Sequence, residues 1–227
     1  MGNPIVYFWG YKTAGIFQNT QEIDEWRAAG NGILQSNVQP GDVRFVDRNH
    51  DGQINDKDKV NLGNGTPDFT LGLNLGFVYK GFDFSIVANG AFGQQIVQSY
   101  RNHTRPTPNY TTAILDRWHG EGTSNRIPRV TDSNINYQFS DLFIQNGDYL
   151  RLSTLTLGYD FAKLFKGKAV SQARLYFQVQ NLFIITGYDG MDPEIGFGSS
   201  NNSWVSGLDY GYYPRPRTVL VGVNLKF

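Results

Sequence analysis

The sequence predicts an all-β protein, on three observations. Of its 227 residues, 15% are aromatic and 26 are glycine, a composition typical of strands joined by tight turns. Several long segments alternate between apolar residues and polar or small ones, which is the period of a strand with two unlike faces. No stretch holds the ~18 consecutive apolar residues that a membrane helix needs. Strands of alternating polarity also account for a mean hydropathy of −0.39.

The charge balance and the lack of cysteine narrow the function classes. Lys plus Arg and Asp plus Glu each number 20, and this balance gives no support for nucleic-acid binding. Without cysteine, the chain has neither disulfides nor thiolate metal sites. The first ten residues, MGNPIVYFWG, lack the basic flank and apolar core of a secretion signal. The sequence therefore predicts either a cytosolic chain or a piece of a larger protein.

The first half of the chain contains one irregular strand and one clear hairpin. Residues 5–17 are aromatic and strand-like but alternate imperfectly. In residues 69–79, FTLGLNLGFVY, every odd-numbered residue is a large apolar one. Lys80-Gly81 makes a tight turn, and residues 82–92 continue the pattern with apolar residues at even positions. These two strands are expected to form a hairpin with one apolar face and one small, polar face.

Three further strands are expected in the second half. Residues 155–161 and 173–183 carry apolar residues at odd positions, except that Asn181 stands on the apolar side. Residues 218–227, TVLVGVNLKF, repeat the pattern as far as Phe227. With residues 5–17, the prediction is about six strands of roughly 9–13 residues, a length that crosses a bilayer at a tilt.

The predicted connections alternate between short and long. Residues 80–81 and 162–172 are short turns, whereas residues 18–68, 93–148 and 184–217 are long loops. Loops beyond ~12–15 residues are uncommon in compact soluble domains. Short periplasmic turns alternating with long outer loops are the layout of an outer-membrane barrel. The sequence therefore predicts strands of a transmembrane antiparallel β-barrel with long extracellular loops.

A soluble β-sandwich is the alternative, because its strands also alternate. Strand length, the near-absence of charge on the apolar face and the Asn, Gln, Ser and Gly opposite it favour the barrel. Two short helices are expected within the loops. A capping box at residues 19–22 opens one that ends at Gly30, and residues 111–120 form a second that ends at Gly120.

Residues 47–58, DRNHDGQINDKD, match the spacing of a twelve-residue calcium loop. Gly52 falls at the sharp turn of position 6, and Ile54 at position 8 would tie the loop to its surroundings. The predicted oxygen ligands are Asp47, Asn49, Asp51, the Gln53 carbonyl, Asn55 and Asp58. Asp58 replaces the usual Glu and is one methylene shorter. A solvated turn rich in Asp and Asn is the alternative.

The expected calcium affinity is that of extracellular modules, ~10⁻⁴–10⁻³ M. Bound calcium would make residues 40–63 rigid and take no part in catalysis. No other pattern points to chemistry: the three histidines lack metal-ligand spacing, and there is no nucleophile, phosphate or dinucleotide motif. The prediction is therefore not an enzyme. A cluster of arginines favours a solvated face over an anion site; it comprises Arg101, Arg105, Arg117, Arg126 and Arg129.

Several collinear stretches cover nearly the whole chain. They are GYKTAGIFQNTQEID, PGDVRFVDRNHDGQINDKDKVNLGN, PDFTLGLNLGFVYKGFDFSIVANGAFGQQI, LDRWHGEGTSNRIPRV, DYLRLSTLTLGYDF, RLYFQVQNLFIITGYDGMDPE and YPRPRTVLVGVNLKF. Together they resemble the SusC/RagA-type TonB-dependent transporters of Bacteroidota outer membranes. That family carries such a calcium-like loop among its outer loops.

The resemblance implies that residues 1–227 are the C-terminal part of such a transporter. The family's barrel has about 22 strands around an N-terminal plug, and the plug is absent here. About six strands would leave two open edges in lipid, so the chain alone is not expected to insert or transport. The implied partners are a SusD-like surface lipoprotein, TonB (through the missing N-terminal part), an oligosaccharide or peptide substrate and outer-membrane lipid.

The terminal Phe227 resembles the signal that the outer-membrane assembly machinery reads. If it is periplasmic, the turns at 80–81 and 162–172 are periplasmic, and the three long loops are extracellular. Aromatic residues in these loops are candidate substrate contacts, or else part of the interfacial girdle; they are Trp118, Tyr188, Trp204, Tyr210, Tyr212 and Tyr213.

Two rival functions come from other classes. One is a soluble calcium-binding β-domain acting in adhesion or docking. The other is a secreted β-sandwich carbohydrate enzyme or binding domain, which would need converging carboxylates on strands.

Overall fold

The computed structural model describes residues 2, 4, 6–34, 36–99, 112–132, 134–162, 170–195 and 206–227. The chain divides into two compact units. The sheet unit comprises Thr66–Gln95, Asn146–Gly196 and Tyr212–Phe227, and the loop unit comprises Met1–Gly65, Ile96–Gln145 and Phe197–Gly211. The described residues are all-β apart from one α-helix and four 3₁₀ turns, which confirms the predicted class.

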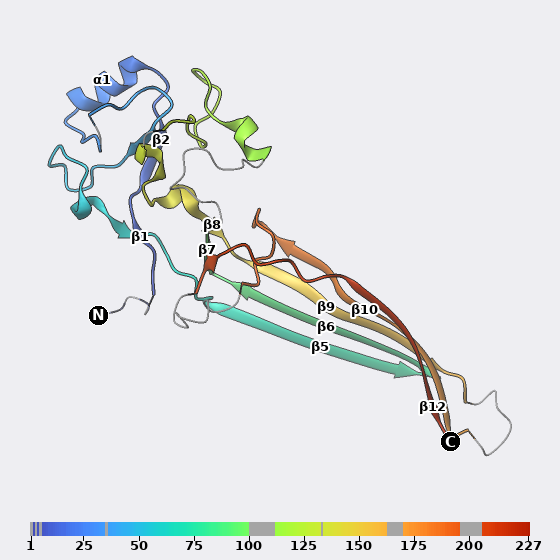
Figure 1. Ribbon diagram of the computed structural model, residues 1–227. Helices are drawn as coiled ribbons and strands as arrows, with labels where there is room; N and C mark the ends of the chain where they lie inside the picture. Colours follow the sequence, from blue (N-terminus) through green and yellow to red (C-terminus); the bar gives the residue numbers. More distant parts are fainter. Residues whose placement is uncertain are drawn as a thin grey trace. The chain divides into compact units, whose positions relative to one another are not determined.

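The sheet unit is built on five long antiparallel strands (Figure 1). They are β5 (Phe69–Tyr79), β6 (Phe82–Phe92), β9 (Tyr149–Asp160), β10 (Gln172–Thr186) and β12 (Thr218–Lys226). Their order across the sheet is β12-β10-β9-β6-β5. The β5–β6 hairpin runs without a register break, as predicted. Lys80 (φ 51°) and Gly81 (φ 92°) both take the left-handed backbone that a two-residue turn of this hand requires.

Two β-bulges interrupt the alternation of the sheet. The pairing of β10 with β9 shifts between Gln180 and Phe183, and Asn181 there has a positive φ of 52°. The apparent misplacement of Asn181 on the apolar side is therefore a bulge, where one extra residue changes the phase of the strand. The pairing of β6 with β9 shifts between Val87 and Ala88.

The two faces of the sheet differ in chemistry. One face presents large apolar side chains that stay exposed, such as Phe69 (58%), Phe77 (63%) and Val221 (70%). No second layer in the described part of the chain covers these rows, whereas a β-sandwich would bury them. The opposite face carries small and polar residues.

The loop unit contains short strands, one helix and its own core. β1 (Trp9–Gly10) pairs with β4 (Val60–Asn61), and β2 (Thr13–Ile16) pairs with β3 (Val43–Phe45), both antiparallel. A three-stranded sheet has the order β11 (Leu208–Asp209), β7 (Gln95–Gln98), β8 (Ile144–Asn146). The 3₁₀ turns are η1 (Asp56–Asp58), η2 (Thr112–Asp116), η3 (Asn134–Tyr137) and η4 (Asp141–Phe143). The core comprises Tyr11, Phe17, Ile23, Val38, Val43, Phe45, Ile54 and Ile135.

The prediction of a sixth strand at residues 5–17 is wrong: the described part of this segment forms only the short strands β1 and β2, so the long sheet has five strands. Gly10 and Gly15 lie within these short strands, and the pairing of β2 with β3 is irregular between Thr13 and Ile16. Gly15 has φ 98°, which an L residue in a strand rarely adopts. Gly10 lies so close to Phe139 that a Cβ would come within 2.6 Å of its carbonyl oxygen.

The helix predicted from the capping box is present as α1 (Thr20–Ala28). The Asn19 side chain accepts a hydrogen bond from the Glu22 amide, and the Glu22 carboxylate accepts one from the amide of Gln18. Gly30 (φ 81°) follows the end of the helix. The second predicted helix is shorter than expected, because only η2 forms and it ends well before Gly120. In the described part of the chain, no helix is long and apolar enough to cross a membrane.

Candidate functional site

The loop predicted to bind calcium folds around the carboxylate of Asp47, whose side chain is buried. Its Oδ2 atom accepts hydrogen bonds from the amides of Gly52 (2.8 Å) and Gly32 (3.2 Å). Its Oδ1 atom is buried without a hydrogen-bond partner. A buried carboxylate oxygen without a donor is costly in a protein interior, so this atom is the strongest local indication of a cation site. Gly52 has φ 79°, as the sharp turn at position 6 requires.

Asp58 serves as a clamp for the loop. Its Oδ1 accepts from the amides of Arg48 (2.9 Å) and Asn49 (3.4 Å), and its Oδ2 accepts from the amide of Asn55 (2.9 Å). Asp58 is fully buried at the end of the short turn η1, so these bonds join the start of the loop to its end. A carboxylate oxygen has two lone pairs, so Oδ2 can accept one more bond in addition to that from the Asn55 amide.

The remaining predicted ligands are tied by local turns. Asn49 Oδ1 accepts from the Asp51 amide, Asp51 Oδ1 from the Gln53 amide, and Asn55 Oδ1 from the Lys57 amide. The Asn49 side-chain amide donates to Asp51 Oδ2 at 2.9 Å, and this bond lowers the pKa of Asp51. Among the described residues, no group of three acidic or histidine side chains converges in a metal-binding arrangement. The loop therefore fits calcium only in part. Asp47 offers a buried oxygen without a hydrogen-bond partner, whereas the side chains of Asn49 and Asp51 are hydrogen-bonded to each other.

Ile54 holds the loop to the rest of the loop unit. It is buried in the same hydrophobic core as Phe45 and Ile135, as its position in the motif predicts. The backbone of residue 32 also lies against the loop, because a Cβ on Gly32 would come within 2.5 Å of the Gln53 carbonyl carbon.

The aromatic residues predicted as substrate contacts differ in accessibility. Tyr210 and Tyr213 are 53% and 88% exposed, Tyr212 is partly buried, and Tyr188 is only 6% exposed. Trp204 lies outside the described residues. Tyr188 packs its ring against Gly190, where a Cβ would overlap the ring.

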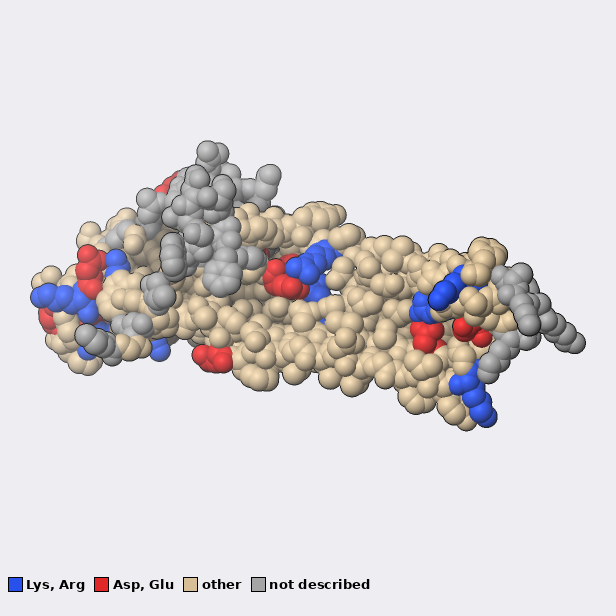
Figure 2. All heavy atoms as spheres, turned by 90° about the horizontal axis from the view of Figure 1, so that it is seen from below, with Lys and Arg blue, Asp and Glu red and all other residues tan. Residues whose placement is uncertain are grey.

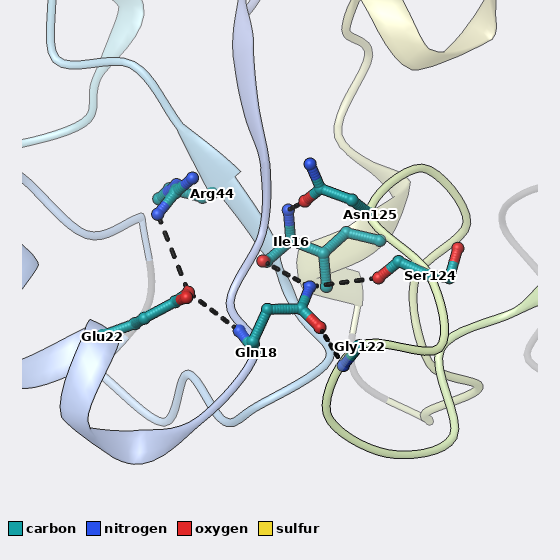
Figure 3. A pocket seen from close by; sticks show the side chains of 7 residues that line it. All are labelled: Ile16, Gln18, Glu22, Arg44, Gly122, Ser124 and Asn125. Atoms are coloured by element: carbon teal, nitrogen blue, oxygen red, sulfur yellow. Dashed lines mark hydrogen bonds and ion pairs between the residues drawn. The ribbon is translucent and has the colours of Figure 1, made fainter.

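Trp118, the sixth candidate contact, is part of a seam within the loop unit. Its indole nitrogen donates to Gln18 Oε1 at 3.2 Å, and its ring covers Gly41. The adjoining hollow has a volume of about 230 Å³. Figure 3 shows the residues that line it: Ile16, Gln18, Glu22, Arg44, Gly122, Ser124 and Asn125. Gln18 donates there to the carbonyls of Ile16 and Ser124 and accepts from the Gly122 amide. The hydrogen bonds of Gln18, which lines the hollow, thus join residues 16–18 to residues 122–124.

Part of the predicted arginine cluster also has a structural partner. Arg129 donates to the buried carboxylate of Asp42 through Nε (2.7 Å) and Nη2 (3.2 Å). Asn136 donates to the same carboxylate at 3.1 Å. Arg101 and Arg105 lie outside the described residues. Arg129 is therefore an internal ion-pair partner, and the prediction of a solvated face is wrong for this residue.

The polar face of the sheet carries two ion-pair clusters that sequence reasoning missed. Arg174 on β10 binds Asp83 on β6 at 2.5 Å. Arg151 on β9 binds Asp192 at 2.5 Å and Glu194 at 2.9 Å. Figure 2 shows one face of the molecule, on which charged side chains over the sheet gather in small groups surrounded by uncharged surface. The one available signal was a charged residue on the polar side of a strand with few other charges.

No protein-family model matches the chain. It is 33% identical over 237 aligned positions, covering the whole chain, to TonB-dependent receptor P3 of Formosa agariphila. It is also 32% identical over 197 residues, 86% of the chain, to TonB-dependent receptor SusC of Bacteroides thetaiotaomicron. The chain is a portion of a SusC-type TonB-dependent receptor. It spans 22% and 18% of the length of these two relatives.

The fold of this receptor portion agrees with a solved structure of the RagAB peptide transporter. The TM-score is 0.70 over the whole chain and 23% of the transporter chain, at 21% identity, which shows that the two share a fold. The relatives are receptors and a transporter and not enzymes, as the sequence predicts.

Proposed function

We propose that the chain forms part of the barrel wall of an outer-membrane TonB-dependent importer for glycan or peptide oligomers. The observation that carries this proposal is the two-sided sheet: strands of 9 to 15 residues with exposed apolar rows on one face and polar groups on the other. Strands of this length and pattern suit a barrel that meets lipid outside and water inside. The receptor relatives support the same assignment.

In this proposal the importer works with two partners. A SusD-like surface lipoprotein captures the oligomer at the barrel mouth, and TonB supplies energy through a part of the receptor other than this chain. The exposed rings of Tyr210 and Tyr213 are the best placed of the predicted substrate contacts, because sugar rings and peptide side chains both pack on aromatic faces.

The test is uptake by a full-length receptor that contains this chain. Cells that produce it should import labelled oligosaccharides or oligopeptides, and the import should stop when TonB is deleted. The receptor should also require detergent for extraction from the outer membrane. A receptor that is released in soluble form would favour the rival reading, a calcium-binding adhesion or docking module.

We further propose that the loop of residues 47–58 binds calcium as a structural ion. Asp47 Oδ1 supports this, since it is buried and lacks a donor. The other ligands would be Asn49, Asp51, the Gln53 carbonyl, Asn55 and the free lone pair of Asp58 Oδ2. Calcium would hold residues 40–63 rigid. Its removal by a chelator should speed proteolysis in this segment, and unchanged cleavage would contradict the proposal. The Asp47→Asn variant should be cleaved rapidly with or without calcium.

A further inference from the structure

Arg151 is a buried charge in the middle of the sheet. It lies on β9, in register with Asn89 of β6 and Ile184 of β10, and only 4% of its surface is exposed. A buried guanidinium is tolerated only when it is paired, because removing its partners costs several kcal/mol. What pairs with Arg151 is therefore held firmly against the sheet.

Both partners of Arg151 come from the segment that follows β10. Arg151 Nη2 donates a hydrogen bond to Asp192 Oδ1 at 2.5 Å, whereas Glu194 Oε2 lies 2.9 Å from Nε as an ion pair without hydrogen-bond geometry. From the other side, Nη2 of Arg215, which precedes β12, lies 3.1 Å from Glu194 Oε1. We call these four residues the Arg151 latch.

Hydrogen bonds between side chains and the backbone reinforce the latch. Asp192 Oδ1 accepts from the Glu194 amide at 2.9 Å, and Asp192 Oδ2 accepts from the Arg215 amide at 3.5 Å. The Tyr188 amide donates to Thr186 Oγ1, whose hydroxyl donates to the Asp148 carbonyl. The latch thus joins the two stems of one loop, residues 187–195 and 212–217, to each other and to β9.

The side of the sheet on which the latch lies gives it a functional meaning. Arg151 shares the polar face with Asn89, whereas Leu150 and Leu152 belong to the opposite, apolar rows. If the apolar face meets lipid, as the proposed function requires, the stems lie on the interior side of the wall. We propose that Arg151 is a positioning residue that holds these two stems inward, so that they narrow the pore and limit the size of the imported oligomer.

The test uses a neutral variant that avoids leaving a charge buried. Replacing both sides of a buried ion pair by neutral groups of similar size is often close to neutral for stability. The triple variant Arg151→Met, Asp192→Asn, Glu194→Gln removes three of the four latch charges and leaves that of the exposed Arg215, and the new side-chain amide at position 192 keeps an acceptor oxygen. It is made in the full-length receptor.

A second ion pair on the same face provides the matched control. Arg174 and Asp83 pair at 2.5 and 2.7 Å, between β10 and β6, near the Lys80-Gly81 turn. Their neutral replacement, Arg174→Met with Asp83→Asn, removes the same chemistry without touching either stem.

Two measurements decide the proposal. Hydrogen exchange of the Glu194 and Arg215 amides should speed up at least about tenfold in the triple variant, equivalent to about 1.4 kcal/mol of opening, and remain unchanged in the control. The largest oligomer imported should increase in the triple variant alone. If the unmodified receptor imports its substrate and the triple variant leaves both measurements unchanged, the latch proposal is wrong. If the unmodified receptor neither inserts nor imports, the proposed function fails instead.

Discussion

Arg174 and Asp83 meet across an intervening strand, directly above Gly158. Arg174 lies on β10 and Asp83 on β6, and β9 runs between them with Gly158 opposite Asp83 and Tyr176. A Cβ on Gly158 would overlap Asp83 Oδ1 and come within 2.6 Å of Arg174 Nε. The glycine is therefore required for a two-strand ion pair, because only a residue without a side chain leaves the space between the charged groups.

Replacing this glycine should break the ion pair. In Gly158→Ala, the added methyl would displace a carboxylate and a guanidinium that are both partly buried. Overpacking of this kind costs about 1–3 kcal/mol. The expected result is a lower unfolding temperature of the detergent-purified receptor. Gly72→Ala on β5 is the control, since nothing lies within 4 Å of its Cβ position. Equal effects of the two substitutions would contradict this account.

A second glycine on the polar face supports an aromatic ring. Gly222 on β12 is paired with Tyr176 on β10, and a Cβ at Gly222 would overlap the tyrosine ring. The Arg174 guanidinium carbon lies over the same ring, 4.9 Å from its centre. Gly222→Val should push the ring away and weaken its stacking with Arg174, which we expect to cost about 1–3 kcal/mol.

The control for this substitution is Gly76→Val on β5, where the Cβ position is open. Unfolding in urea measures both variants. If Gly76→Val destabilised the receptor as much as Gly222→Val, the loss would reflect strand propensity and not the ring.

The bounds of a strand were predictable from the sequence where the alternation of apolar and polar residues was uninterrupted. They were not predictable where a bulge shifted the alternation by one residue. β5 and β6 begin and end where expected. β9 begins at Tyr149, six residues before the predicted start at 155. Its apolar residues are even-numbered up to Leu152 and odd-numbered from Leu155, because the register shift opposite Val87 and Ala88 leaves an extra residue on β9. A period-two pattern cannot show a strand across such a shift.

Some features of the candidate site were likewise predictable from the sequence and others were not. The spacing of residues 47–58 and the burial of Ile54 were predictable because they depend on local sequence. The clamp role of Asp58 was not, since it depends on the geometry of η1. The Arg151 latch joins residues 41 positions apart in the chain, and no local pattern encodes that contact.

Asp58 should be more important for the cation loop than its neighbour Asp56. The Asp58 carboxylate accepts hydrogen bonds from three backbone amides inside the loop. The Asp56 side chain is instead 88% exposed and forms an ion pair with Lys59 at 2.8 Å. Asp58→Asn places an amide donor against amide donors, which should cost about 1–3 kcal/mol. Asp56→Asn should change little, because an exposed ion pair contributes about 0–1 kcal/mol.

Limited proteolysis of the loop without calcium checks this prediction. Cleavage between residues 40 and 63 should be faster in Asp58→Asn than in the unmodified receptor, and unchanged in Asp56→Asn. Similar cleavage of both variants would show that the hydrogen bonds of Asp58 matter no more than the loss of one negative charge from the loop.

Tyr11 should make the loop unit sensitive to alkali. Burial in the core raises the pKa of its phenol above the ordinary 10.0, an effect that the Lys59 ammonium, 5.2 Å from the ring centre, partly opposes. Because the folded pKa is the higher one, this contribution is complete below pH 10.0. It is lost as the pH rises through the folded pKa, since the unfolded phenol ionises first. Tyr11→Phe should therefore reduce the loss of protection against hydrogen exchange in residues 11–17 above pH 10.0. Its core contact with Phe45 should persist, because that contact needs only the ring. An alkaline loss of the same size in Tyr11→Phe would assign the effect to other groups.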